Sequence, residues 1–405
     1  MTDTLKPRDE TDVVEALTWA VSNGKTLEVI GHGSKRAIGR AAQTDLTLDV
    51  SGISGVVLYE PNELILSAKA GTPAADIEKT LADHHQELAF EPMDCGPLLS
   101  APSGRGTLGG VISANLSGPR RLKAGAARDY SLGVRAVSGR GERFKAGGRV
   151  VKNVTGYDLS KLVAGSWGTL AVLTELTIKV VPRAEDVSTM LVHGLDDERA
   201  REAITAAMDS PGEVSAAAHL PKRAASRMPV ASVAGAGGAL TALRLEGISV
   251  SVAFRRKKLE EILHRFGPLA TLGVEDSRAF WRGIRDVIPF ADGAERAVWR
   301  ISVAPTDGPK IGAALTAATE AEVFYDWAGG LIWAEMPTAI AEEAAVRVAL
   351  GGRGHALLIR AEPAVRASAH VFEPPDRALA ALSKRLKESF DPKGILNPGR
   401  MHAGI

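Results

Sequence analysis

The chain has 405 residues, of which 45% are apolar and 24% charged, which is typical of a soluble globular protein with two or more domains. Lys and Arg number 49 and Asp and Glu number 48, which gives a formal net charge of +1. A chain this close to neutral does not point to nucleic acid as a partner. Cys95 is the only cysteine, which excludes an internal disulfide, and an iron–sulfur cluster or cysteine-rich zinc site built from this chain alone. No apolar run is long enough to span a bilayer and the N-terminus is polar, so we expect a cytoplasmic protein.

The first part of the chain alternates predicted helices and strands. Residues 10–22 have apolar side chains on one helical face, and Asp12 with Glu15 could form a capping box at the start. We expect strands at residues 26–31, 44–51, 55–61, 63–71 and 171–181. A helix is expected at residues 72–85.

After Pro182 the pattern predicts an α+β unit with antiparallel strands. Its expected helices lie at residues 195–209, 255–266, 280–286, 309–319 and 339–349. The stretch "SVSVAF" (249–254) reads as a strand, and the small-residue patch 231–240 reads as a surface loop. A last helix is expected over 374–390, with Leu379, Leu382, Leu386 and Phe390 on one stripe.

Many of the 42 glycines cluster before residue 170, which indicates that the backbone approaches another group closely. "GHGSK" (31–35) follows a predicted strand. It does not fit the Rossmann pattern, because Arg36 stands where a third glycine is needed, and no G-K-[ST] completes a Walker loop. Taken alone, this segment is either an ordinary surface turn or a phosphate-binding loop.

Further segments extend the pattern: "GTLGG" (106–110) with Asn115 and Gly118, "RDYSLGVRAV" (128–137), the long segment 147–182, and "FDPKGILNPGRM" (390–401). In order and spacing they resemble the flavoprotein family that includes vanillyl-alcohol oxidase and the FAD-linked 2-hydroxy-acid dehydrogenases. The resemblance implies an α+β fold. A two-lobed vanillyl-alcohol oxidase-type (PCMH) FAD-binding domain would span 1–182, an α+β, ferredoxin-like cap domain 183–371, and a segment returning to the FAD domain 372–405.

The same resemblance implies which residues bind FAD. Backbone N–H groups of the first loop would hold the pyrophosphate, and other residues would lie along the ribityl chain and flavin edge. The last two would face the adenine half through backbone groups. In that order they are Gly31, His32, Gly33, Ser34 and Lys35, then Thr107, Gly109, Gly110 and Asn115, then Gly168 and Val172. Relatives that bind FAD covalently have the order G-G-H-S here. His32 stands one place early, so we expect non-covalent FAD.

Catalytic relatives also carry paired histidines in the cap, with acids that bind a divalent metal. The matching stretch here, "GGRGHALLIRAE" (351–362), has only His355, and we expect no metal site. His355 and Arg300 are the candidates for a catalytic role, with a structural role as the alternative for each. Several other cap side chains could line a pocket or belong to the core: Trp281, Arg282, Trp299, Tyr325 and Trp327.

Within the family, the short first loop, the form of "KNVTGYDL" (152–159) and the length resemble the FAD-binding E-type subunits of bacterial glycolate oxidase. This implies a complex with a catalytic flavin subunit and an iron–sulfur subunit. The complex would act on a small hydroxy acid and reach the inner membrane only through these partners. The alternative is a self-sufficient FAD-dependent dehydrogenase for glycolate or D-lactate.

Overall fold

A computed structural model describes residues 3–41, 43–149 and 156–404, so residues 150–155 of the predicted segment 147–182 lie outside it. The first part of the chain forms two sheets, with strand orders β1-β3-β2 and β4-β5-β9-β7-β8. The first is parallel and the second antiparallel. The strands of the first sheet are β1 (Thr4–Leu5), β2 (Leu27–Ile30) and β3 (Leu46–Asp49). Those of the second are β4 (Val56–Glu60), β5 (Ile65–Lys69), β7 (Ser131–Ser138), β8 (Arg143–Gly147) and β9 (Ala171–Lys179).

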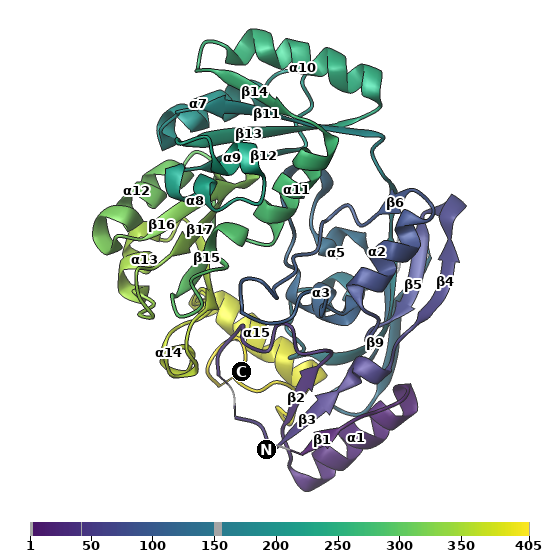
Figure 1. Cartoon of the computed structure of the whole chain (residues 1–405). Helices are drawn as coiled ribbons and strands as arrows, with labels where there is room; N and C mark the ends of the chain where they lie inside the picture. The colour runs from purple at the N-terminus through teal and green to yellow at the C-terminus, as the bar shows by residue number, and fades with distance from the viewer. Residues whose placement is uncertain (1–2, 42, 150–155, 405) are drawn as a thin grey trace.

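Helices flank these two sheets (Figure 1). Each sheet with its helices is one lobe of this part of the chain. The helices are α1 (Glu10–Asn23), α2 (Ala74–Ala82), α3 (Leu108–Ala114), α4 (Arg121–Ala124), α5 (Ala127–Tyr130) and α6 (Leu159–Val163). A short pair of strands, β6 (Gln86–Glu87) and β10 (Val181–Pro182), lies where the chain leaves this part.

The middle of the chain forms one antiparallel sheet with the order β14-β11-β13-β12-β16-β17-β15-β18. Each half has the element order β-α-β-β-α-β and the strand order 4-1-3-2, which is the ferredoxin-like arrangement. The first half contains β11 (Asp186–His193), α7 (Asp197–Met208), β12 (Ala216–Leu220), β13 (Leu240–Gly247), α10 (Ser249–Leu263) and β14 (Leu269–Leu272). The second contains β15 (Val298–Val303), α12 (Gly308–Thr319), β16 (Glu322–Asp326), β17 (Leu331–Glu335), α13 (Glu343–Leu350) and β18 (Gly354–Arg360).

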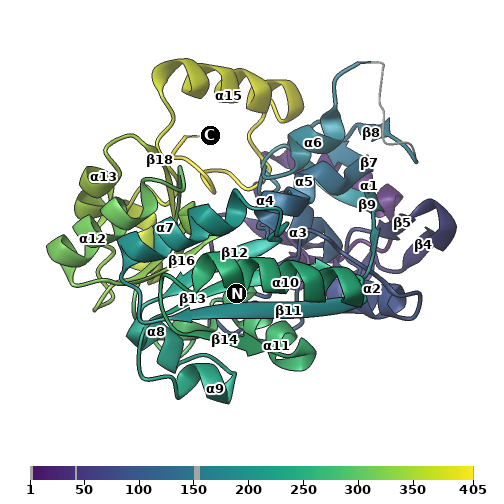
Figure 2. The ribbon, with the colours of Figure 1, turned by 90° about the horizontal axis from the view of Figure 1, so that it is seen from above.

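The two halves join through β12 and β16, where His219 pairs with Tyr325. Seen from above, α7 and α10 lie across the strands of the first half (Figure 2). Helix α11 (Val274–Arg285) links the halves and packs on β11, where the buried Trp281 Nε1 donates to Thr189 Oγ1 at 2.9 Å. The cap is therefore two ferredoxin-like units side by side rather than one.

Three local predictions are wrong. Residues 249–254 are not a strand but the first turns of α10, in which Val252 is buried while Val250 is 83% exposed. The patch 231–240 contains a short helix, α9 (Ala231–Ala234), and the first residue of β13. Asp12 and Glu15 do not form the predicted capping box at the start of helix α1. Asp9 caps this helix, and its side chain accepts from two N–H groups of the first turn.

The C-terminal segment lies against the first part of the chain, where Figure 1 shows it in yellow beside the purple strands. After α15 (Arg377–Phe390), Leu396 forms a parallel bridge with Leu27 of β2. Lys387 Nζ is buried and donates to Asp391 (2.7 Å), to the Thr169 carbonyl (2.7 Å) and to the Leu396 carbonyl (2.8 Å). This network holds the end of the chain on the first part. None of the helices in the described ranges is long and apolar enough to cross a membrane.

We predict that Lys387→Met lowers the free energy of unfolding by about 3 kcal/mol, because the Asp391 carboxylate, which is fully buried, loses its cation. Chemical denaturation followed by circular dichroism measures the change. Lys384→Met is the matched control on the exposed side of α15 and should change stability by less than about 0.5 kcal/mol. Equal stability of the two variants would contradict the role of this pair.

Candidate cofactor cleft

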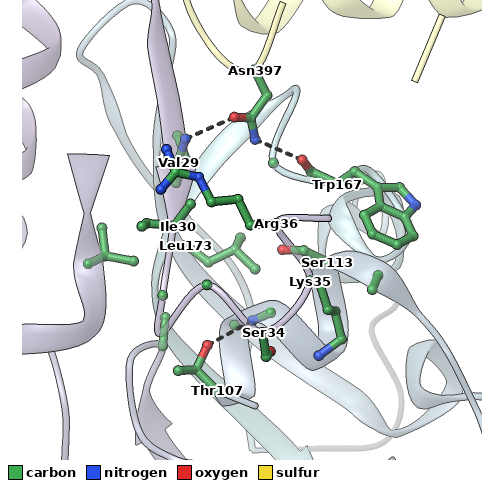
Figure 3. Close-up of a pocket in the computed structure, with 18 of the residues that line it drawn as sticks. Val29, Ile30, Ser34, Lys35, Arg36, Thr107, Ser113, Trp167, Leu173 and Asn397 are labelled. Atoms are coloured by element: carbon green, nitrogen blue, oxygen red, sulfur yellow. Dashed lines mark hydrogen bonds between the residues drawn. The ribbon is translucent and has the colours of Figure 1, made fainter. Parts of the chain in front are cut away.

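A cleft lies where β2 ends, between the loop 31–36, the start of α3 and the loop that precedes β9 (Figure 3). It contains about 710 Å³ of space not filled by atoms, counting its open mouth. Its walls come from three segments that are far apart in the sequence, and Asn397 and Arg400 of the C-terminal segment complete them. The cleft therefore brings together the glycine-rich segments that the sequence singles out.

The first wall is a loop of exposed backbone. Gly33 has a φ of +74°, a left-handed conformation that favours glycine. A Cβ on Gly31 would lie 2.5 Å from Thr107 Oγ1, so only glycine allows this approach of the two walls. In the part of the chain that the structure describes, the N–H groups of residues 32–35 make no hydrogen bond to another protein group. These donors are available to an anion in the cleft.

The second wall is the start of α3. Thr107 caps this helix, and its Oγ1 accepts from Gly110 N at 3.3 Å. Gly109 N donates to the Ala70 carbonyl at 2.8 Å, and a Cβ on Gly109 would meet Ala70 at 3.0 Å. Glycine at this position lets the helix start directly against β5.

The third wall is fixed by Asn397, which is 3% exposed. Its Oδ1 accepts from Val29 N and its Nδ2 donates to the Trp167 carbonyl, both at 2.8 Å (Figure 3). Gly168 has a φ of +71°, and a Cβ there would lie 2.6 Å from Asn397 Nδ2. The Asn397 side chain thus bridges strand β2 and the loop 167–168 and fixes the distance between them.

Three cations line the cleft, Lys35, Arg36 and Arg400, and no Asp or Glu is among its lining residues in the described ranges. Glu28, just outside the lining, pairs with Arg36 at 2.5 Å and lies 3.6 Å from Arg400, so it offsets part of this charge. Arg400 donates to the Lys35 carbonyl at 2.7 Å. Burial lowers the pKa of Arg400 to about 10, which still leaves it a cation at neutral pH. Free N–H donors, cations and glycines without Cβ atoms together suit the pyrophosphate of a dinucleotide.

Most of the predicted FAD-binding residues line this one cleft: Gly31, His32, Gly33, Ser34, Lys35, Thr107, Gly109, Gly110 and Gly168. Two do not. Asn115 ends α3 with a φ of +50° and accepts from Arg128 N, and Val172 is buried in the core between Ala171 and Leu173, which do line the cleft. The roles of all these residues toward FAD stay predictions. Trp167 and Arg400 also line the cleft. The sequence analysis singled out the segments that contain them, 147–182 and 390–401, but named neither residue.

The two catalytic candidates lie outside the cleft lining. His355 is exposed on the edge strand β18. The Arg300 guanidinium lies 4.8 Å from the centre of the Trp327 ring, and burial together with Arg121 lowers its pKa to about 10. Next to Trp327, burial raises the pKa of Asp326 to about 8. Among the described residues, no group of three His, Cys, Asp or Glu side chains is placed to hold a metal ion.

Comparisons with known proteins agree with this geometry. Residues 4–147 match the family described as FAD binding domain, and residues 371–401 match the FAD linked oxidases, C-terminal domain. Glycolate oxidase subunit GlcE of Escherichia coli (strain K12) is 33% identical over 395 residues, 97% of each chain. Glycolate oxidase subunit GlcD of Bacillus subtilis (strain 168) is 45% identical over 85 residues, 21% of this chain and 18% of that one.

Among solved structures, p-cresol methylhydroxylase has a TM-score of 0.74 at 13% identity, covering 99% of this chain and 88% of its own. Alkyldihydroxyacetonephosphate synthase has a TM-score of 0.70 at 18% identity, covering 98% and 75%. At these identities the likeness concerns the fold, which is the PCMH-type FAD-binding fold with a cap.

The fold and the cleft therefore define an FAD-binding protein of the FAD-linked oxidoreductases. The 33% sequence identity over 97% of both chains shows in addition that the chain belongs to the family of glycolate oxidase subunit GlcE. This confirms the family resemblance, the fold class and the FAD cofactor that the sequence implied.

We predict that Gly33→Trp abolishes FAD binding, because an indole at this position fills the cleft beside the free N–H groups. The ratio of flavin absorbance to protein absorbance after purification measures the content. Gly237→Trp is the control, since Gly237 has a similar φ of +71° but lies outside the cleft lining. A folded Gly33→Trp protein with full FAD content would show that the pyrophosphate is held elsewhere.

We also predict that the FAD is not covalently attached. The basis is the G-H-G-S order, which places His32 one residue before the position used for attachment in covalent relatives. Acid precipitation should leave the flavin in the supernatant. Flavin fluorescence retained by the washed pellet, and lost in His32→Ala, would overturn this prediction.

Proposed function

We propose that this chain is the FAD-binding subunit of a glycolate oxidase (glycolate dehydrogenase) complex. The observation that carries the proposal is the match to a glycolate oxidase subunit over 97% of both chains. The cleft adds support, because free N–H groups and cations of the loop 31–36 and Arg400 of the C-terminal segment line it, and no carboxylate is among its described lining residues.

The proposed partners are a catalytic flavin subunit, of the kind represented by the relative GlcD, and an iron–sulfur subunit. Cys95 is the only cysteine of the chain and is buried, so clusters that carry electrons onward would have to lie in another chain. We propose that the complex acts on a small hydroxy acid in the cytoplasm and reaches the inner membrane through these partners.

FAD, when bound, supplies a two-electron acceptor. The residues of this chain would bind and orient it. The N–H groups of 32–35 would hold the pyrophosphate, while Lys35 and Arg400 would neutralise it. Asn397 would keep the distance between β2 and the loop at 167–168 fixed. These are binding roles, and none of them moves a proton from a substrate.

The alternative function is a self-sufficient dehydrogenase of a 2-hydroxy acid. It would need a base for the hydroxyl proton and a cation for the carboxylate. The cap offers Arg300 and the buried Asp326, whose raised pKa of about 8 is suited to accepting a proton only above that pH. His355 is exposed on an edge strand, which argues against a histidine pair like that of the catalytic relatives.

We therefore predict that the purified, FAD-loaded chain does not reduce an artificial dye with glycolate or D-lactate at a useful rate. An alkoxide-like hydroxyl costs too much without a placed base or metal. Steady-state turnover measures this. Co-expression with the two partner subunits should restore glycolate oxidation and give a complex from which all three chains are purified together.

Robust dye reduction by the chain alone would contradict the proposal. Loss of that activity in Asp326→Asn or Arg300→Gln, with FAD content unchanged, would assign the chemistry to the cap and establish the self-sufficient dehydrogenase. Loss of dye-reducing activity in His355→Ala would likewise establish the self-sufficient dehydrogenase and would assign the chemistry to the edge strand β18.

A further inference from the structure

A second hollow lies between the FAD-binding part and the cap, bordered by α2 and β6 on one side and by α11 on the other. It contains about 990 Å³ of space not filled by atoms, counting its open mouth. None of its lining residues lines the cofactor cleft. Six arginines and three glutamates line it, and Glu246 and Asp286 behind the lining neutralise some of these arginines.

The floor of the hollow is a network of buried ion pairs in which the charges are satisfied. Arg120 contacts Glu87 at 2.7 Å and Glu246 at 2.6 Å, and Arg244 contacts Glu91 at 2.7 Å and Glu246 at 2.8 Å. Burial alone would raise the pKa of Glu246, but the two arginines lower it to about 2, so this carboxylate stays ionised. The floor therefore has no spare cation for a ligand.

The wall formed by α11 is different. Arg285 is fixed by two bonds to the Asp286 carboxylate, at 2.8 and 2.9 Å. Among the described residues, Arg278 pairs with Glu275 alone, whose side chain is 84% exposed, so solvent strongly screens this ion pair. In the described ranges, Arg282 and Arg183 have no carboxylate within ion-pair distance and their guanidiniums donate no hydrogen bond. Both side chains are exposed, and these two arginines without a carboxylate partner line one hollow from two segments.

We infer that this hollow is a second ligand site, which binds a compact multivalent oxyanion between Arg183, Arg278 and Arg282. Guanidinium groups bind carboxylate and phosphate oxygens in a forked geometry, and several of them around one space favour a ligand with more than one negative charge. A di- or tricarboxylate and a small phosphate share this chemistry.

A ligand there would connect two parts of the protein. Glu78, Glu87 and Arg120 belong to the FAD-binding part, whereas Arg183 and α11 belong to the cap. The Asp286 carboxylate that fixes Arg285 also accepts from Asp94 N, in the segment that leads toward α3. An oxyanion held at this junction would therefore strengthen the contact of the cap with the FAD-binding part.

The test uses the full FAD-loaded chain, so that the cofactor cleft is filled. Isothermal titration calorimetry at constant ionic strength measures binding of citrate, of pyrophosphate and of acetate. Citrate or pyrophosphate should bind saturably and acetate should not, and the tighter of the two identifies a carboxylate or a phosphate as the ligand chemistry. Arg183→Gln/Arg282→Gln should weaken binding by about tenfold or more.

The matched control is Arg377→Gln/Arg385→Gln on the exposed face of α15, which removes the same charge outside the hollow's lining and should leave the affinity unchanged. Circular dichroism and FAD content check that both variants are folded and loaded. The site is refuted if neither multivalent probe binds, if the hollow variant binds as the unmodified protein does, or if the control loses as much affinity. None of these outcomes bears on the role in glycolate oxidation.

Discussion

The two hydrogen bonds of Asn397 are the constraint on which the cofactor cleft depends. They join the end of β2 to the loop at Trp167, across 368 residues on one side and 230 on the other. The Lys387–Asp391 pair then fixes the segment that carries Asn397. Asn397, Lys387 and Asp391 are buried, so leaving one of them unpaired would cost about 1–3 kcal/mol of the domain's stability. The first part of the chain therefore completes its cleft only when the last residues are in place.

Local chemistry made much of the cleft predictable. The glycines at 31, 33, 109 and 168 stand where the backbone must be left-handed or must approach another segment closely, and such a requirement is visible in a sequence. Trp167 and Arg400 stand in segments that the sequence singles out, but only the tertiary arrangement shows that these two residues of those segments reach the cleft. Val172 was predicted to face the adenine half through its backbone. The alternation of β9 turns its side chain into the core, which leaves that backbone role a prediction.

The fold shows the same division. Long helices with an apolar face, such as 10–22 and 374–390, were predicted within a few residues. "SVSVAF" was not, because its alternating valines fit a strand, whereas the basic residues that follow continue α10. In α15, the expected apolar stripe is only partly covered, with Leu379 and Leu382 about half exposed. The doubling of the cap could not be inferred, because the two ferredoxin-like halves share strand order without an evident repeat in sequence.

The contact between the cap and the FAD-binding part combines two kinds of interaction. Apolar packing places Trp327 and Trp281 in one core with Ala114, Leu116 and Trp167 of the FAD-binding part. Trp327 Nε1 also donates to the Gly118 carbonyl at 3.0 Å. The backbone of Trp327 is in the left-handed region, with a φ of +52°. Such backbone strain persists only where the surroundings determine the conformation. The buried network of Arg120, Arg244 and Glu246 adds direction to this contact, since ion pairs specify geometry where apolar packing alone does not. The cap is thereby oriented both by packing on Ala114 and Trp167, which line the cofactor cleft, and by an ion-pair network that lies outside the cleft lining.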